Sequence, residues 1–106
     1  MRNKEILITI AIINFNRRKF LDRSIRSCLD QVLLGTQKIE LIIIDDNSKD
    51  GSIEYLNYYK KMYRNVRVFV NKKNMGIGYN SNLAVKKARG ELFIRVDSDD
   101  YLSKIS

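Results

Sequence analysis

The strongest constraint on the fold is an alternation of two kinds of segment along the chain. Four runs rich in β-branched and other apolar residues have the length of buried strands, and they lie at 6–13, 41–44, 66–70 and 91–96. Between them, apolar residues recur every three or four positions, as in amphipathic helices, over 17–34, 52–63 and 79–88. The sequence therefore predicts an α/β fold with a four-stranded parallel sheet in β-α-β-α-β-α-β order, with helices on both faces.

Individual residues predict where the helices begin and end. Ser52 is expected to begin the second helix, and Gly35 to end the first. Gly90 follows the third helical segment, and we expect it to close that helix as a left-handed cap.

The residue types that the chain lacks exclude several classes of site. With no His and a single Cys in 106 residues, the chain cannot form an internal disulfide, a zinc finger or a Ser-His-Asp triad. Any metal would be a hard cation bound by oxygen atoms. No apolar run approaches the roughly 20 residues of a membrane span, and the first apolar run lacks a signal-peptide cleavage site. We therefore expect a single cytoplasmic domain.

Charge is distributed unevenly along the chain. Lys and Arg outnumber Asp and Glu by 20 to 12, for a net charge of +8, and half of the acids lie within 45–50 and 97–100. A basic body with two acidic spots suits an anion-binding site built around a cation, although a solvated basic surface is the simpler interpretation. The charge balance also permits nucleic acid as a partner, or anionic lipid along the basic segment at 17–26.

Polar residues concentrate directly after the predicted strands. In a parallel sheet these segments meet at one edge, where open α/β folds bind ligands. They are 14–16, 45–51, 71–78 and 97–100.

The Asp-x-Asp motif at Asp97 and Asp99 is the sharpest chemical signal. Neighbouring carboxylates repel each other, and a divalent cation relieves that cost. The alternative is structural, because Asp99 or Asp100 would also suit the cap of a helix that begins near Tyr101.

A second acidic cluster runs from Asp45 to Ser48. A carboxylate fixed at a strand end can accept a hydrogen bond from the imide N–H of a pyrimidine base, and Ser48 would orient that carboxylate. The alternative is an Asx-turn that Asp50 and Gly51 complete.

Two further features are suited to a nucleotide. Phe15 follows the first strand and would stack on a base, or else is an ordinary core aromatic residue. Lys72 and Lys73, with Gly76 and Gly78 leading into a helix, offer cations and backbone N–H groups to a phosphate, unless the glycines only shape a turn.

Taken together, these residues resemble the N-terminal half of the family 2 glycosyltransferases of the GT-A fold, over residues 6–104. The motifs that carry the resemblance are Ile-Thr-Ile-Ala-Ile-Ile-Asn-Phe-Asn at 8–16, Glu-Leu-Ile-Ile-Ile-Asp-Asp-Asn-Ser-Lys-Asp-Gly-Ser at 40–52, Asn-x-Gly at 74–76, Asn82, Ala-Arg-Gly-Glu at 88–91 and Asp-Ser-Asp-Asp at 97–100.

The resemblance implies a site for a nucleotide-sugar donor. Phe15 would stack on the base and Asp46 would bind it, while Asp97 would contact the ribose or the metal. Asp99 would hold Mn²⁺ or Mg²⁺ against the diphosphate. The donor-binding residues that it implies are Phe15, Asn16, Asp46, Ser48, Gly76, Asn82 and Asp97, with Asp99 and Asp97 at the metal.

The resemblance also implies the function. Residues 1–106 would be the donor-binding half of a metal-dependent inverting glycosyltransferase in glycan or polysaccharide synthesis, with a UDP-sugar favoured and a glycan or lipid-linked acceptor. The acceptor half and its general base are expected beyond Ser106, so no catalytic residue is assigned, and the chain alone is expected to be inactive. A cytoplasmic location is expected, including the inner face of the membrane.

Two other classes of function are weighed against this one. The acidic run at 45–47 resembles the pocket of phosphoacceptor receiver domains, but receivers place the acid pair after the first strand and the phosphoacceptor after the third. Here those strands are followed by Asn14 and Asn71. A basic nucleic-acid-binding module would have to use the Tyr- and Lys-rich run at 58–63, which is more typical of a helix with one buried face.

Overall fold

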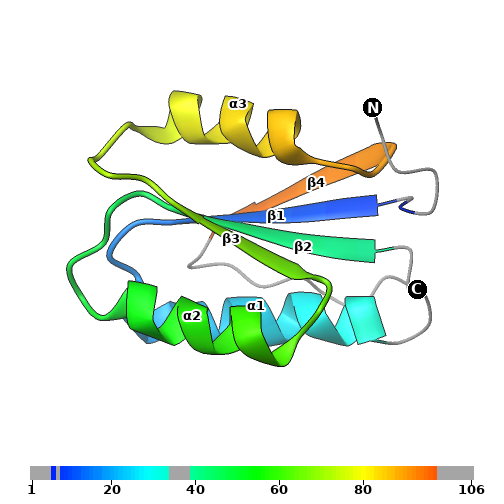
Figure 1. Ribbon diagram of the computed structural model, residues 1–106, viewed down its shortest axis with the longest axis horizontal. Helices are drawn as coiled ribbons and strands as arrows, with labels where there is room; N and C mark the ends of the chain where they lie inside the picture. The colour runs from blue at the N-terminus through cyan, green and yellow to red at the C-terminus, as the bar shows by residue number, and fades with distance from the viewer. Residues whose placement is uncertain (1–5, 7, 34–38, 98–106) are drawn as a thin grey trace.

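The computed structural model of the chain describes residues 6, 8–33 and 39–97. Along these residues the elements are β1 (Ile8–Asn14), α1 (Arg18–Leu33), β2 (Ile39–Asp45), α2 (Ser52–Met62), β3 (Val66–Val70), α3 (Ile77–Lys87) and β4 (Leu92–Asp97). The predicted order of strands and helices is confirmed (Figure 1). The predicted helix end at Gly35 lies outside the described residues.

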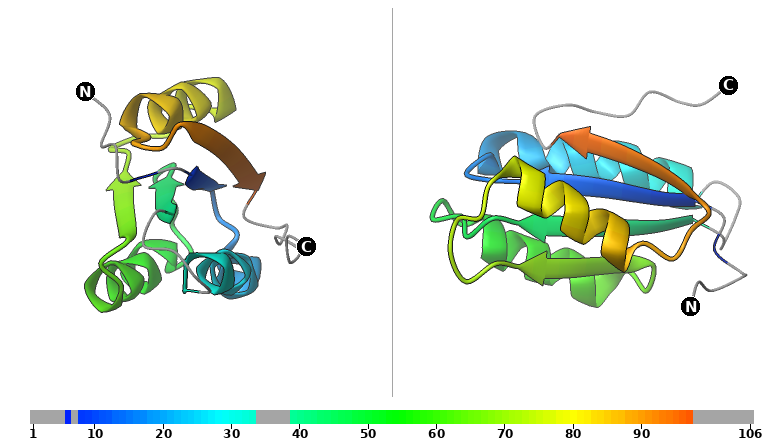
Figure 2. Two further views of the ribbon diagram at one scale, coloured as in Figure 1. Left: turned by 90° about the vertical axis from the view of Figure 1, so that its right-hand side faces the viewer. Right: turned by 90° about the horizontal axis from the view of Figure 1, so that it is seen from above.

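The four strands form one parallel sheet in the order β3-β2-β1-β4. Helices α1 and α2 cover one face and α3 covers the other, as the end-on view in Figure 2 shows. The chain winds outward from β1 in both directions, so β1 and β2 are the central strands. The predicted α/β class, with helices on both faces, is confirmed.

The central strands are mostly apolar between their ends because both of their faces are buried. Alternate residues face opposite sides of a strand. Ile10, Ile12 and Ile43 therefore pack into the larger core under α1 and α2, while Ala11 and Ile42 pack into a smaller core under α3. Such two-sided burial is what a near-continuous apolar run indicates in a parallel sheet.

Gly90 is not the left-handed cap that the sequence predicts. It is absent from the described residues with positive φ, and α3 passes instead into an extended residue, Ala88. A Cβ on Gly90 would lie 2.7 Å from the backbone nitrogen of Thr9. Glycine is therefore required because two backbones approach each other closely here. In the sequence, a glycine that follows a helical segment looks the same for this role as for a helix cap.

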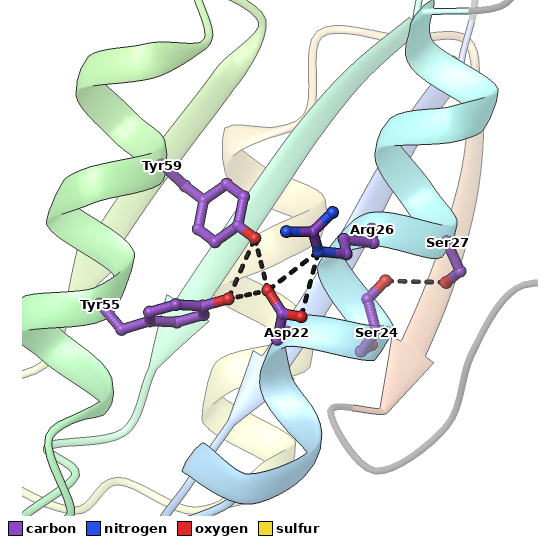
Figure 3. Close-up of polar contacts among 6 residues, drawn as sticks. All are labelled: Asp22, Ser24, Arg26, Ser27, Tyr55 and Tyr59. Carbon is purple, nitrogen blue, oxygen red and sulfur yellow. Dashed lines mark hydrogen bonds and ion pairs between the residues drawn. The ribbon is translucent and has the colours of Figure 1, made fainter.

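A cluster of polar side chains joins α1 to α2 (Figure 3). The Asp22 carboxylate accepts hydrogen bonds from the hydroxyls of Tyr55 and Tyr59, the latter at 2.7 Å. It also forms an ion pair with Arg26 at 3.1 Å. The hydrogen bond from Tyr59 lowers the pKa of Asp22 and, with the charge of Arg26, outweighs the opposing effect of burial. Burial and the contact with Asp22 raise the pKa of Tyr59 to about 12.

We expect Asp22→Asn to lower the free energy of unfolding at neutral pH by about 1 kcal/mol, because two hydroxyls lose a charged acceptor that is itself partly exposed. Because folding lowers the pKa of Asp22, this stabilisation is complete above the unfolded pKa of about 4 and is lost as the pH falls through the lower folded value. Urea unfolding of both proteins against pH measures the difference. If the difference in free energy of unfolding between the two proteins stayed constant down to acid pH, this role of the carboxylate would be contradicted.

Candidate functional site

Three loops meet at the edge of the sheet formed by the carboxyl ends of the strands, which we call the carboxyl edge. They connect β1 to α1, β2 to α2 and β3 to α3, and Figure 1 shows them on the left of the molecule. The strands end in register, with Asn14 beside Asp45 and Asp45 beside Val70. The predicted gathering of polar segments at one edge is therefore confirmed for these three loops.

The two consecutive acids at the end of β2 have different partners. Because successive residues of a strand point to opposite faces, Asp45 and Asp46 diverge. Asp45 accepts hydrogen bonds at 2.8 Å from the side-chain amide of Asn14 and from both the backbone N–H and the hydroxyl of Ser48. The carboxylate that Ser48 orients is therefore that of Asp45, and all three side chains are buried.

Further hydrogen bonds tie the loop after β1 to the loop after β2. The backbone N–H of Asn16 donates to the Ser48 hydroxyl at 2.9 Å, and the Asn16 side chain accepts from the backbone N–H of Lys49 at 2.8 Å. The backbone N–H of Arg18 donates to Asp50 at 2.8 Å. Asp50 also accepts from the backbone N–H and hydroxyl of Ser52, which confirms the predicted turn.

Phe15 is held between these fixed positions but is itself exposed. Its neighbour Asn14 is buried, and its neighbour Asn16 has a left-handed φ of 52°. The side chain of Phe15 nevertheless remains 44% exposed. The alternative interpretation of Phe15 as a core aromatic is therefore wrong. An exposed aromatic ring on a loop that is held by hydrogen bonds suits stacking on a planar ligand.

Asp46 anchors the loop that leads into α3. Its carboxylate accepts hydrogen bonds from the Asn71 side chain at 2.9 Å and from the backbone N–H groups of Met75 at 2.7 Å and Gly76 at 3.0 Å. Burial acts to raise the pKa of Asp46, but these hydrogen bonds outweigh it and lower the pKa. Asp46 is thus a buried, ionised carboxylate that fixes Gly76 at the start of α3, and its contact with a base stays a prediction.

The remaining predicted residues are placed less completely. Asn82 is exposed on α3, and no hydrogen bond joins it to the described loops. Asp97 ends β4 beside Ile13, so its backbone reaches the carboxyl edge. The side chain of Asp97 and the whole of Asp99 lie outside the part of the chain that the structure describes.

The described acids at this edge do not suit a metal ion. Asp45, Asp46 and Asp50 are engaged by N–H and O–H donors, and residues 6, 8–33 and 39–97 contain no group of three candidate ligands. An oxygen-bound cation at this edge would therefore depend on Asp97 and Asp99, and the predicted metal site stays a prediction.

Sequence reasoning missed the pairing of Asn14 with Asp45 and the role of Asn80 at this edge. Asn14 and Asp45 bind each other across neighbouring strands. Asn80 is buried on α3 and accepts a hydrogen bond at 2.6 Å from Asn71, the residue that also binds Asp46. An Asn at an inward position of an amphipathic helix was the available signal for Asn80, since buried amides require partners.

The fold and the edge define a doubly wound α/β domain with loops arranged for a ligand, and the comparisons place it in a family. The model of glycosyl transferase family 2 matches residues 9–105. The chain belongs to this family. It is 38% identical over 96 residues to a poly(ribitol-phosphate) beta-glucosyltransferase of Bacillus spizizenii, covering 90% of this chain but 15% of that protein.

Solved structures agree with this fold. S. aureus TarS 1-349 in complex with UDP-GlcNAc has a TM-score of 0.80 at 28% identity, covering 91% of this chain and 27% of that one. A mannosyltransferase of Pyrobaculum calidifontis in complex with GDP-Man and Mn²⁺ has a TM-score of 0.77 at 17% identity, covering 89% of this chain and 28% of that one. At this identity the likeness supports the fold alone. The predicted GT-A fold is confirmed, and the chain spans a minor share of these proteins. None of the described helices has the length and apolarity to span a membrane.

Proposed function

We propose that this chain is the donor-binding part of a metal-dependent, inverting glycosyltransferase and that it binds a nucleoside diphosphate sugar, with a UDP-sugar favoured. The observation that carries the proposal is the exposed ring of Phe15, held at the carboxyl edge between the buried Asn14 and the hydrogen-bonded Asn16. Membership of the family supports the same ligand class, as does the relative of known structure that binds UDP-GlcNAc.

Phe15 would form the base platform of this site. Stacking of a base on an aromatic ring contributes about 1–3 kcal/mol and tolerates different bases. On the other side of the proposed nucleotide site would be the loop before α3, where Asp46 fixes the backbone of Gly76. Lys72 and Lys73 are exposed in that loop and are placed to attract the phosphates electrostatically.

A divalent cation, Mn²⁺ or Mg²⁺, is part of the proposal, with Asp99 and Asp97 as its protein ligands. Such an ion would stabilise the negative charge that develops on the departing nucleoside diphosphate. The other acids of the carboxyl edge are occupied by hydrogen bonds, which supports the assignment of this role to the acids that follow β4.

The proposal also covers the division of the enzyme into two halves, the acceptor and the cellular location. Residues 1–106 would be the donor half, with the acceptor half and general base supplied by sequence beyond Ser106, and the chain alone would bind the donor without turnover. The small share of each related protein that the chain covers supports this division. The acceptor would be a glycan or a lipid-linked sugar on the cytoplasmic side. Contact with anionic lipid stays a prediction, supported by exposed Arg17 and Lys19 near the start of α1.

Isothermal titration of UDP with and without Mn²⁺ tests donor binding. We expect the chain to bind UDP in the presence of Mn²⁺ and to lose at least about tenfold in affinity without the ion, because the uncompensated diphosphate then faces carboxylates. Asp99→Ala should give the same loss with Mn²⁺ present. Asp30→Ala, which removes an exposed carboxylate of α1, is the matched control. Equal heats for all proteins and conditions would rule out the proposed metal-assisted site.

A further inference from the structure

Four polar residues join the loops after β1 and β2, and we call them the inter-loop network: Asn14, Asn16, Asp45 and Ser48. We infer that this network sets the backbone conformation at Phe15, and that Ser48 and Asp45 act on the donor only by positioning that residue. The inference rests on the proposed function, because it assigns Phe15 to the nucleotide.

The hydroxyl of Ser48 is the centre of the network and has no capacity left for a ligand. It donates to Asp45 at 2.8 Å, and it accepts from the backbone N–H of Asn16 at 2.9 Å and from the side-chain amide of Asn14 at 3.3 Å. A hydroxyl offers one donor and two acceptor positions. All three are used, and Ser48 is only 4% exposed. The predicted direct contact of Ser48 with the donor therefore has no free capacity of the side-chain hydroxyl to support it.

Asp45 is equally committed to the protein. Its Oδ1 accepts from the amide of Asn14 and from the hydroxyl of Ser48, and its Oδ2 accepts from the backbone N–H of Ser48. The residue is fully buried. A buried carboxylate needs such donors because it has lost its hydration. Its partners are Asn14, which directly precedes Phe15 at the end of β1, and Ser48 in the loop after β2, so Asp45 joins these two segments rather than a ligand.

The network acts on Phe15 because it fixes the residue on each side of the ring. Asn14 is bonded through its side chain, and Asn16 is bonded through both its backbone N–H and its side chain. Asn16 has a left-handed φ of 52°, which Asn adopts more readily than other side-chain-bearing residues and which these hydrogen bonds hold. An exposed ring on a fixed backbone loses less freedom on binding, and the expected gain in ligand affinity is about three- to tenfold.

A fluorescent reporter tests the positioning without any ligand. The chain contains no Trp, so Phe15→Trp introduces a single reporter. We expect time-resolved anisotropy to show more rotational freedom of this reporter, through motion of its loop, after Ser48→Ala than in the parent protein, and recovery with Ser48→Thr, which keeps the hydroxyl. Ser27→Ala is the control, because that hydroxyl bonds within α1, to the backbone of Ser24 (Figure 3). Equal rotation in the Ser48→Ala and parent proteins would overturn the inference.

A double-mutant cycle on UDP affinity separates positioning from general stability. Ser48→Ala should weaken UDP binding about three- to tenfold when Phe15 is present and cause no further loss in Phe15→Ala, because both changes remove the same interaction. Equal losses in both backgrounds would contradict action through the ring. If the unmodified chain binds no UDP, the proposed function fails, and the anisotropy experiment still decides the positioning.

Hydrogen exchange in the unmodified chain keeps the test independent of whether Ser48→Ala folds. The amides of Asn16 and Lys49 lie in loops, where unbonded amides exchange rapidly with solvent. The amide of Asn16 donates to the Ser48 hydroxyl, and the amide of Lys49 donates to the Asn16 side chain. We therefore expect both amides to exchange at least about tenfold more slowly than the amide of the exposed Lys73, which lies in a neighbouring loop. Exchange as fast as at Lys73 would overturn the inference.

Discussion

Replacing Glu40 with Gln is expected to lower the free energy of unfolding by about 3 kcal/mol. The Glu40 carboxylate is buried near the start of β2, at the edge of the sheet opposite the loops. One oxygen accepts from the Thr9 hydroxyl at 2.7 Å and from the backbone N–H of Arg89 at 2.6 Å, and the other accepts from the Arg67 guanidinium at 3.0 Å. An amide NH₂ in place of either oxygen would face a donor, so at least one of these donors would be left unpaired.

Urea unfolding at neutral pH measures this loss, with Glu91→Gln as the control. Glu91 is exposed in the connection between α3 and β4, which also contains Arg89, and its replacement should change the free energy of unfolding by less than about 0.5 kcal/mol. Because Glu40 is remote from the carboxyl edge, the folded fraction of Glu40→Gln should bind UDP with unchanged affinity. A loss below about 1 kcal/mol would show that the hydrogen bonds around Glu40 are replaced by water.

The second large effect is expected on the ligand. Phe15→Ala should weaken UDP binding by about tenfold or more, because a stacked base contributes about 1–3 kcal/mol. The free energy of unfolding should change little, since the ring is 44% exposed and lies outside both cores.

Phe20→Ala is the matched control for Phe15→Ala. Phe20 is 42% exposed on the first turn of α1, so its replacement removes a ring of similar exposure that belongs to no loop of the carboxyl edge. Its UDP affinity should equal that of the unmodified chain. Equal losses from both replacements would mean that exposed aromatic rings bind the nucleotide without a defined site.

The fold was predictable because its signals are local. Near-continuous apolar runs such as 41–44 indicate strands buried on both faces, and the helical spacing between runs indicates the crossovers. The observed order and layers agree with that prediction. Parallel strands then bring Phe15 and Asp46 to one edge by topology alone. The position of this edge could therefore be predicted before any side-chain geometry was known.

The partners of individual side chains were not predictable in the same way. Which of Asp45 and Asp46 meets Ser48 depends on the side of β2 that each residue faces, and a shift of one residue in register exchanges the two. The role of Gly90 depends on a contact with Thr9, 81 positions away along the chain. These interactions are set by tertiary packing, which no short motif encodes.

The most direct test of a nucleotide site at the carboxyl edge is the map of amide chemical-shift changes as UDP is added with Mg²⁺. We expect changes concentrated at Phe15, Asn16 and Gly76, which lie in loops on either side of the end of β2. The amides of Glu40 and Arg89, at the opposite edge, should not change. No response, or changes that spread evenly over the exposed lysines of all three helices, would contradict a nucleotide site formed by these loops.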